Sequence, residues 1–166
     1  MAGMLHRRLA ATALALICAA ALSGCAREQA PAVDYTLLDG QKASSQQWAG
    51  KVMLVNFWAT SCATCVKEMP QIVATHEKYK ARGLDTVAVA MSYDPPAFVA
   101  RFAETRKLPF GVAIDNTGSV ATAFGQVQMT PTTFLINKRG EIVKRYVGEP
   151  DFAALHGLIE QLLAEA

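Results

Sequence analysis

The segment over residues 52–83 constrains the fold of this chain more than any other. It begins with VMLVNFW, residues 52–58, an apolar run interrupted by a single asparagine. Such a run predicts a central strand that is buried on both faces of a sheet. From Cys62 onward the apolar residues recur at helical spacing, until Gly83 provides a helix stop. Cys62 and Cys65 therefore lie where a buried strand passes into a helix.

The rest of the chain alternates strands with helices. The predicted elements are a hairpin around Asp39-Gly40, a strand over 84–91, a helix from Asp94 to about Thr105, a short strand over 111–115, a hairpin over 132–147 and a final helix from Asp151. Asp94 and Asp151 are expected to cap their helices. This order predicts a single α/β domain: a three-layer sandwich with a central mixed sheet flanked by helices, and an N-terminal hairpin extension.

The first 33 residues are predicted to precede the folded domain. Residues 1–24 combine a basic start with an apolar run too short to span a bilayer, as a secretory signal does. The sequence LSGC that ends at Cys25 resembles the lipobox of bacterial lipoproteins, which implies cleavage before Cys25 and a lipid on its sulfur. An ordinary signal peptide or an uncleaved anchor is the alternative. Residues 25–33 then form the lipid attachment site and a polar tether, and residues 34–166 form the domain.

Charge and cysteine content narrow the chemistry. The full chain has 16 Lys and Arg against 14 Asp and Glu, and both extra cations, Arg7 and Arg8, lie in the signal segment. A balanced mature chain offers no electrostatic argument for a nucleic-acid partner. Cys18 also leaves with the signal and Cys25 is assigned to the lipid, so two cysteines are left as thiols.

The motif Cys62-Ala63-Thr64-Cys65 has three readings: a redox pair, half of a metal site, or a structural link. Unpaired N–H groups and the positive dipole end at a helix start stabilise a thiolate, so Cys62 is expected to be the nucleophile. Cys65, one turn into the helix, is then the resolving thiol. Zinc normally needs four ligands, and the mature chain has no further thiol, so no metal site is expected. A disulfide across so small a loop would stabilise the fold little.

The run VNFWATSCATCVKEMP, residues 55–70, resembles the active-site region of the thioredoxin superfamily. It is most similar to the TlpA/ResA-like, membrane-anchored thiol:disulfide oxidoreductases of bacterial envelopes. Pro70 lies at the position of the helix proline in that family, and Thr130-Pro131 resembles its cis-proline loop. Glu68 fits a C-x-x-C-x-x-E-x-P pattern that is common in this branch. The resemblance extends from about Tyr35 to the end of the chain, and it implies a thioredoxin-like sandwich that needs no cofactor.

The resemblance also implies how the partner chain is bound. Trp58 is expected to form a wall of the substrate groove, with an ordinary core aromatic as the alternative. Thr130 and Pro131 are expected to form a cis bond that turns the Thr130 backbone toward an extended partner chain.

The proton acceptor for Cys65 is left open by the sequence. Asn56 stands where thioredoxin itself buries an aspartate, and an amide cannot act as a base. Glu68, one helical turn beyond Cys65, and Asp94, at the end of the next strand, are therefore the candidates. Each could instead be an ordinary carboxylate: a solvated one at Glu68 and a helix cap at Asp94.

These features predict an enzyme that performs thiol–disulfide exchange, acting as a reductase of envelope proteins. Reduction is favoured because Ala63-Thr64 lacks the histidine that would stabilise a strongly oxidising thiolate. The expected partners are a protein disulfide substrate, a membrane electron donor and the membrane itself, reached through the lipid anchor. The expected location is the bacterial cell envelope, facing the periplasm or the cell exterior.

Two other functions are the alternatives to this one. A peroxiredoxin-like thiol peroxidase would resemble P-x-x-x-T-x-x-C, but Val55 and Ala59 stand at the Pro and Thr positions. A non-catalytic chaperone that handles copper or heme is the second alternative; its copper-delivering relatives typically use a longer C-x-x-x-C spacing with a distant histidine.

Overall fold

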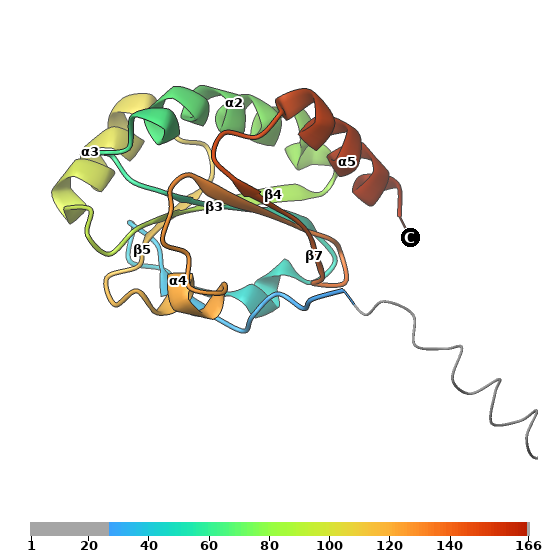
Figure 1. The fold of residues 1–166 in the computed structure, drawn as a ribbon, viewed down its shortest axis with the longest axis horizontal. Helices are drawn as coiled ribbons and strands as arrows, with labels where there is room; N and C mark the ends of the chain where they lie inside the picture. The colour runs from blue at the N-terminus through green and yellow to red at the C-terminus, as the bar shows by residue number, and fades with distance from the viewer. Residues whose placement is uncertain (1–26, 166) are drawn as a thin grey trace, which may run out of the picture.

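The computed structural model describes residues 27–165 (Figure 1). The predicted signal segment 1–24 and the predicted attachment site at Cys25 lie outside these residues. Within the described chain no helix is long and apolar enough to cross a bilayer.

A five-stranded mixed sheet forms the middle layer, in the order β5-β4-β3-β6-β7. Strands β3 and β4 and strands β4 and β5 pair in parallel, whereas β6 pairs antiparallel with β3 and with β7. The strands are β3 (Val52–Trp58), β4 (Leu84–Ala90), β5 (Gly111–Ile114), β6 (Thr132–Ile136) and β7 (Ile142–Val147). The predicted three-layer α/β sandwich with a mixed sheet is confirmed.

Helices cover both faces of this sheet. Figure 1 shows α2 (Ala63–Tyr79), α3 (Pro96–Arg106) and α5 (Phe152–Ala164) on one face. The short helices η1 (Ser45–Trp48) and α4 (Ser119–Ala123) lie on the opposite face, and η2 (Lys80–Arg82) extends α2. The predicted N-terminal hairpin is present as β1 (Asp34–Thr36) and β2 (Lys42–Ser44), which pair antiparallel.

Strand β3 is buried on both faces, as its composition predicts. Alternate side chains of a strand point to opposite faces. Leu54 and Trp58 accordingly belong to the core under α2 and α5, and Val55 and Phe57 belong to the core under η1 and α4. Asn56 has the parity of Leu54 and Trp58, so this one polar residue of the strand faces α2.

Two of the predicted helix boundaries behave as expected and one does not. Gly83 ends the α2–η2 segment with a left-handed φ of 105°, and the Asp151 carboxylate accepts the N–H groups of Ala153 and Ala154 to cap α5. The predicted Asp94 cap is wrong. Helix α3 begins at Pro96, and its first turn receives no hydrogen bond from a side-chain cap, because the Asp94 carboxylate is bound elsewhere.

The segment before β1 lies on the domain instead of forming a free tether. Gln29 forms an antiparallel bridge with Glu141, the carbonyl of Glu28 accepts the N–H of Ile142 at 2.7 Å, and Val33 is buried. The tether predicted over 25–33 is therefore too long, since the chain is already part of the domain at Glu28. The contacts are backbone hydrogen bonds to β7 and to the turn before it, which composition alone does not reveal.

Candidate active site

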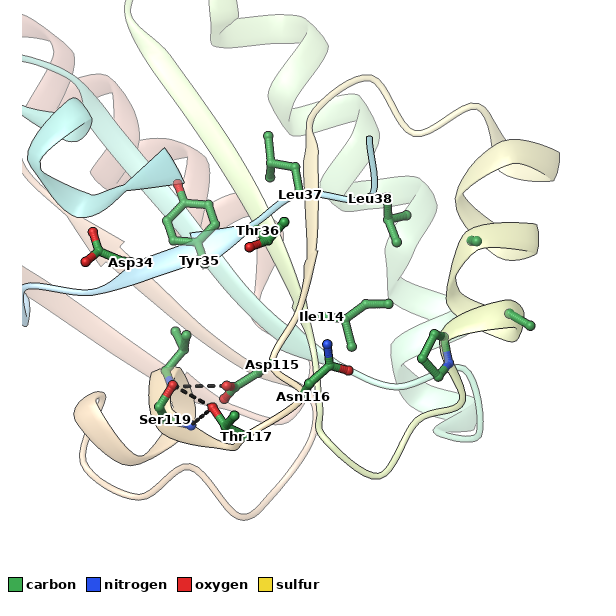
Figure 2. Close-up of a pocket in the computed structure, with 14 residues that line it drawn as sticks. Asp34, Tyr35, Thr36, Leu37, Leu38, Ile114, Asp115, Asn116, Thr117 and Ser119 are labelled. Atoms are coloured by element: carbon green, nitrogen blue, oxygen red, sulfur yellow. Dashed lines mark hydrogen bonds between the residues drawn. The ribbon is translucent and has the colours of Figure 1, made fainter. Parts of the chain in front are cut away.

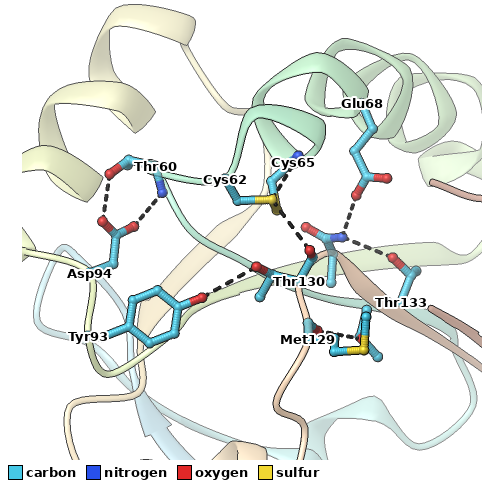
Figure 3. Close-up of a disulfide and its surroundings, with 11 residues drawn as sticks. Thr60, Cys62, Cys65, Glu68, Tyr93, Asp94, Met129, Thr130 and Thr133 are labelled. Atoms are coloured by element: carbon cyan, nitrogen blue, oxygen red, sulfur yellow. Dashed lines mark hydrogen bonds between the residues drawn. A yellow bond between two sulfur atoms is a disulfide. The ribbon is translucent and has the colours of Figure 1, made fainter. Parts of the chain in front are cut away.

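Cys62 and Cys65 form a disulfide at the start of α2, with sulfurs 2.17 Å apart (Figure 3). Cys62 is the N-cap residue of α2, and its Sγ accepts the backbone N–H of Cys65 at 3.1 Å. Cys65 is completely buried, whereas Cys62 is half-buried. A partner approaching from solvent therefore meets the sulfur of Cys62, the one that receives a hydrogen bond from the helix start.

The loop before β6 lies opposite the disulfide. The Thr130-Pro131 peptide bond is cis, as predicted, and the Thr130 carbonyl oxygen is 3.5 Å from Cys62 Sγ. A reduced Cys62 thiol can donate a hydrogen bond to this oxygen, whereas the disulfide sulfur can only contact it. The Tyr93 hydroxyl holds the loop from the other side, 3.3 Å from Thr130 Oγ1 (Figure 3).

Two large exposed side chains flank this loop. Tyr93 is 56% exposed and Met129 is 66% exposed, and Figure 3 shows both beside Thr130. Large apolar side chains this exposed near a reactive group are typical of a binding surface. Sequence reasoning missed both residues, since each lies in a loop where no periodicity separates exposed from buried positions.

A buried polar group lies between β3 and α2. The Asn56 side-chain amide donates to Glu68 Oε1 at 3.0 Å and to Thr133 Oγ1 at 2.9 Å. Glu68 is 0% exposed, so it is not the solvated carboxylate of the alternative reading. Cys65 and Glu68 are three residues apart on the helix, and both face the sheet.

Burial raises the pKa of Glu68 from its ordinary value of 4.5 to about 7. The hydrogen bond from Asn56 opposes this shift, and the nearby negative charge of Glu149 adds to it. Glu68 Oε2 and Asn56 Oδ1 have no hydrogen-bond partner within the described residues. Glu68 is thus a buried carboxyl that can exchange a proton near neutral pH.

Asp94 is bound to the turn that precedes the disulfide. Its two oxygens accept the backbone N–H and the hydroxyl of Thr60, both at 2.6 Å. Figure 3 shows Asp94 and Thr60 together, to the left of both cysteines. Both carboxylate oxygens are occupied by Thr60, so the structure gives Asp94 a role in fixing the chain between β3 and Cys62.

Trp58 does not form a groove wall. Its side chain is 0% exposed and packs on Phe102 with ring centroids 5.0 Å apart. A side chain without exposed surface cannot contact a partner, so the substrate-binding role predicted for Trp58 is wrong. The sequence contains the signal, since Trp58 belongs to an apolar run that predicts a strand buried on both faces of the sheet.

A separate cleft of about 590 Å³ lies between the N-terminal hairpin, α3 and α4. Figure 2 shows Tyr35, Ile114 and Asn116 around it. The Asp115 carboxylate there accepts the N–H groups of Val120 and Ala121, so it serves the start of α4. Neither cysteine lines this cleft, and residues 27–165 contain no group of three His, Cys, Asp or Glu side chains that could hold a metal.

The fold and the disulfide at a helix start define a thioredoxin-like thiol–disulfide oxidoreductase. Residues 26–159 match the family model described as Redoxin. The thiol-disulfide oxidoreductase ResA of Halalkalibacterium halodurans is 35% identical over 84% of this chain and 75% of its own length. ResA of Bacillus anthracis is 34% identical over 81% of this chain and 77% of its own length. The chain therefore belongs to the Redoxin family, and specifically resembles its ResA-like members.

Solved structures agree with this assignment. A protein of Neisseria meningitidis provisionally described as a thioredoxin is 41% identical, with a TM-score of 0.78 over 85% of this chain and 93% of that one. A thiol:disulfide interchange protein of Chlorobium tepidum is 26% identical, with a TM-score of 0.78 over 86% of this chain and 100% of that one. The chain is an oxidoreductase that carries out thiol–disulfide exchange.

Proposed function

We propose that this chain reduces disulfides of envelope proteins, and that a lipid on Cys25 holds it at a membrane. The observation that carries the proposal is the asymmetry of the cysteine pair. Cys62 is reachable and receives a hydrogen bond from the helix start, while Cys65 is completely buried behind it. This asymmetry supports one sulfur as the attacking group and the other as the group that completes the exchange.

The proposed reaction transfers two electrons to the substrate. The Cys62 thiolate attacks one sulfur of the substrate disulfide, forming a mixed disulfide and releasing the first substrate thiolate, which takes a proton. Cys65 loses its proton and attacks Cys62 Sγ, which releases the second substrate thiolate. The substrate ends as a dithiol, and the enzyme ends with the Cys62–Cys65 disulfide that the structure contains.

Glu68 is the proposed acceptor of the Cys65 proton. It is buried on the same side of α2 as Cys65, and its pKa of about 7 allows it to take up and release a proton near neutral pH. Asp94 is the weaker candidate because Thr60 occupies both of its oxygens. Thr130 and Pro131 are proposed to bind the partner chain beside Cys62, supported by the 3.5 Å contact of the Thr130 carbonyl.

A trapping experiment tests the exchange and the roles of the two cysteines. The full chain is reduced in neutral detergent, freed of reductant and mixed with insulin, whose chains are joined by disulfides. We expect Cys62→Ser to form no adduct and Cys65→Ser to accumulate a mixed disulfide through Cys62, identified by peptide mass. Faster alkylation of Cys65 than of Cys62 in the reduced wild type would show that the roles are reversed.

The lipid anchor needs its own test. In the proposal, Cys25 becomes the acylated N-terminus of the mature chain, and the membrane holds the chain near its electron donor. Cys25→Ala should release a detergent-free soluble protein that reduces insulin as fast as the wild type. A mature N-terminus at another residue would contradict the anchor without affecting the exchange reaction.

A further inference from the structure

A groove lies between α2 and α3, next to the turn that carries Cys62. It consists of two adjoining hollows of about 270 and 290 Å³, which share Phe102 and Arg106. Its lining residues come from both helices and from the turns next to them: Thr60, Val66, Met69, Pro70, Val73, Phe98, Arg101, Phe102, Thr105, Arg106 and Leu108. Thr60 and Val66 bracket Cys62, and the Val66 N–H donates to the Cys62 carbonyl at 3.0 Å. The groove thus continues from the active-site turn.

The walls of the groove are apolar and open to solvent. Phe98 is 61% exposed, although it lies one helical turn from the half-buried Phe102. Phe102 in turn packs on the buried ring of Trp58. An exposed aromatic side chain above a fixed, partly buried one forms a hydrophobic surface that can take up an apolar side chain of another molecule.

Two arginines at this groove have no acidic partner. Neither Arg101 nor Arg106 forms an ion pair or hydrogen bond with any described residue, and Arg106 lies over the Phe102 ring at 5.6 Å. Three other arginines of the described chain are paired with carboxylates: Arg27, Arg82 and Arg139. The groove therefore presents two guanidinium groups whose charge is available to a partner.

Acidic side chains nearby do not neutralise this charge. The lining residues of the groove include no Asp or Glu. Asp94 is buried and bound through both oxygens to Thr60. Glu104 follows Arg101 by three residues on α3, but the two side chains form no ion pair in the described chain. Guanidinium groups pair with carboxylates in a bidentate geometry that adds specificity as well as energy.

We propose that this groove binds an acidic segment with an apolar residue in the substrate protein, next to the cysteine that Cys62 attacks. The carboxylates of that segment pair with Arg101 and Arg106, and its apolar side chain contacts Phe98 and Phe102. This inference rests on the proposed function and specifies the substrate class: disulfides whose flanking sequence is acidic and apolar.

The test compares three disulfide substrates with the prereduced full chain in neutral detergent. Two are peptides that each contain one internal disulfide and one tryptophan. They are identical except at four residues that flank the disulfide, which are all Glu in one peptide and all Lys in the other. The third is the small uncharged disulfide of 2-mercaptoethanol. In low salt we expect the second-order rate constant for the Glu peptide to exceed that for the Lys peptide about tenfold, and we expect high salt to remove most of the difference.

Variants identify the groups responsible. Arg101→Glu combined with Arg106→Glu should reverse the preference, whereas Arg101→Lys combined with Arg106→Lys should keep its direction. The matched control, Lys42→Glu with Lys144→Glu, changes the net charge equally at exposed residues outside the groove, and should keep the wild-type preference. All variants should reduce the small disulfide at the wild-type rate, which also shows that they are folded.

If the wild type reduces the two peptides with equal rate constants, the groove assignment is overturned. It is also overturned if the control variant reverses the preference for the Glu peptide as strongly as the arginine variant does. In both cases reduction of the small disulfide would leave the proposed function standing. A reduced wild type that reacts with none of the three disulfides would contradict the proposed function itself, and the groove assignment with it.

Discussion

The side chains of Asn56 and Glu68 meet in the interior, where the amide of Asn56 donates to Oε1 of Glu68 at 3.0 Å. The same amide group also donates to Thr133 Oγ1, so one asparagine connects the central strand, the helix that carries both cysteines, and strand β6. Because Glu68 is fully buried, its ionisation bears on the stability of the fold, and the proposed exchange reaction uses the same carboxyl group.

The rate at which Cys65 resolves the mixed disulfide should follow the ionisation of Glu68. If Glu68 accepts the Cys65 proton, the step that resolves the mixed disulfide accelerates as pH rises through the Glu68 pKa of about 7. Glu68→Gln should slow this step about 100-fold at pH 8 and remove its rise near pH 7. Stopped-flow measurement of substrate thiol release gives the rates. The control is Glu77→Gln, which removes an exposed carboxylate on the same helix and should keep the wild-type pH profile. If Glu68→Gln also kept the wild-type pH profile, Glu68 would be excluded as the acceptor.

The stability of the oxidised chain should depend on the same group. The pKa of Glu68 is raised from 4.5 to about 7, so the folded state binds the proton more tightly than the unfolded state. The stabilisation is fully present below pH 4.5 and is lost as pH rises through about 7. At about 1.4 kcal/mol per pKa unit, the loss is about 3 kcal/mol. Urea unfolding of the wild type and of Glu68→Gln between pH 4 and 8 measures it, and parallel curves for the two proteins would refute the assignment.

His76 should make a contribution of the opposite sign. It is 5% exposed, its Nδ1 lies 3.1 Å from Thr86 Oγ1, and burial lowers its pKa below the ordinary 6.5. The unfolded state then binds the proton more tightly, so stability that is present above pH 6.5 is lost as the solution is acidified. In the same urea series, His76→Gln should lose less stability on acidification than the wild type. A curve that shifts in the same direction as that of Glu68→Gln would contradict this prediction.

Asp94 should matter for the fold and not for proton transfer. Two charged hydrogen bonds of 2.6 Å link it to Thr60. Asp94→Ala should lower the free energy of unfolding by about 2 to 4 kcal/mol, since it leaves the Thr60 N–H and hydroxyl without their acceptors. The milder Thr60→Ala removes one of the two bonds and should cost about half as much. If Asp94→Ala also removed the rise in rate near pH 7, Asp94 would replace Glu68 as the proton acceptor.

Local patterns predicted the elements whose residues are neighbours in the sequence. The buried run of β3, the helix that follows Cys62, the hairpin around Asp39-Gly40 and the Asp151 cap all depend on contacts within a few residues, and all are confirmed. The disulfide is also a local contact, because its two cysteines are three residues apart in the sequence.

Contacts between distant residues could not be predicted in this way. The bond from Thr60 to Asp94 spans 34 residues, and nothing near Asp94 in the sequence distinguishes this partner from a helix N-terminus. The exposed positions of Tyr93 and Met129 depend on how separate loops meet around the disulfide. Trp58 differs from these cases, because the continuous apolar run of its own strand already indicates burial on both faces.

The bridge between Gln29 and Glu141 also places the start of the described chain at the opposite end of the strands from the disulfide. Strand β6 starts at Thr132, beside the active-site loop, so the turn before Glu141 lies at the opposite end of the strands. From Cys25 to the first docked residue, Glu28, the chain can span only about 10 Å, whereas seven-residue β3 is about 23 Å long. A lipid on Cys25 would therefore hold the domain at the end of the strands that is farthest from Cys62. With the strands upright on the membrane, an electron donor in the same membrane would have to carry its thiols on a part that projects about a strand's length into the aqueous phase.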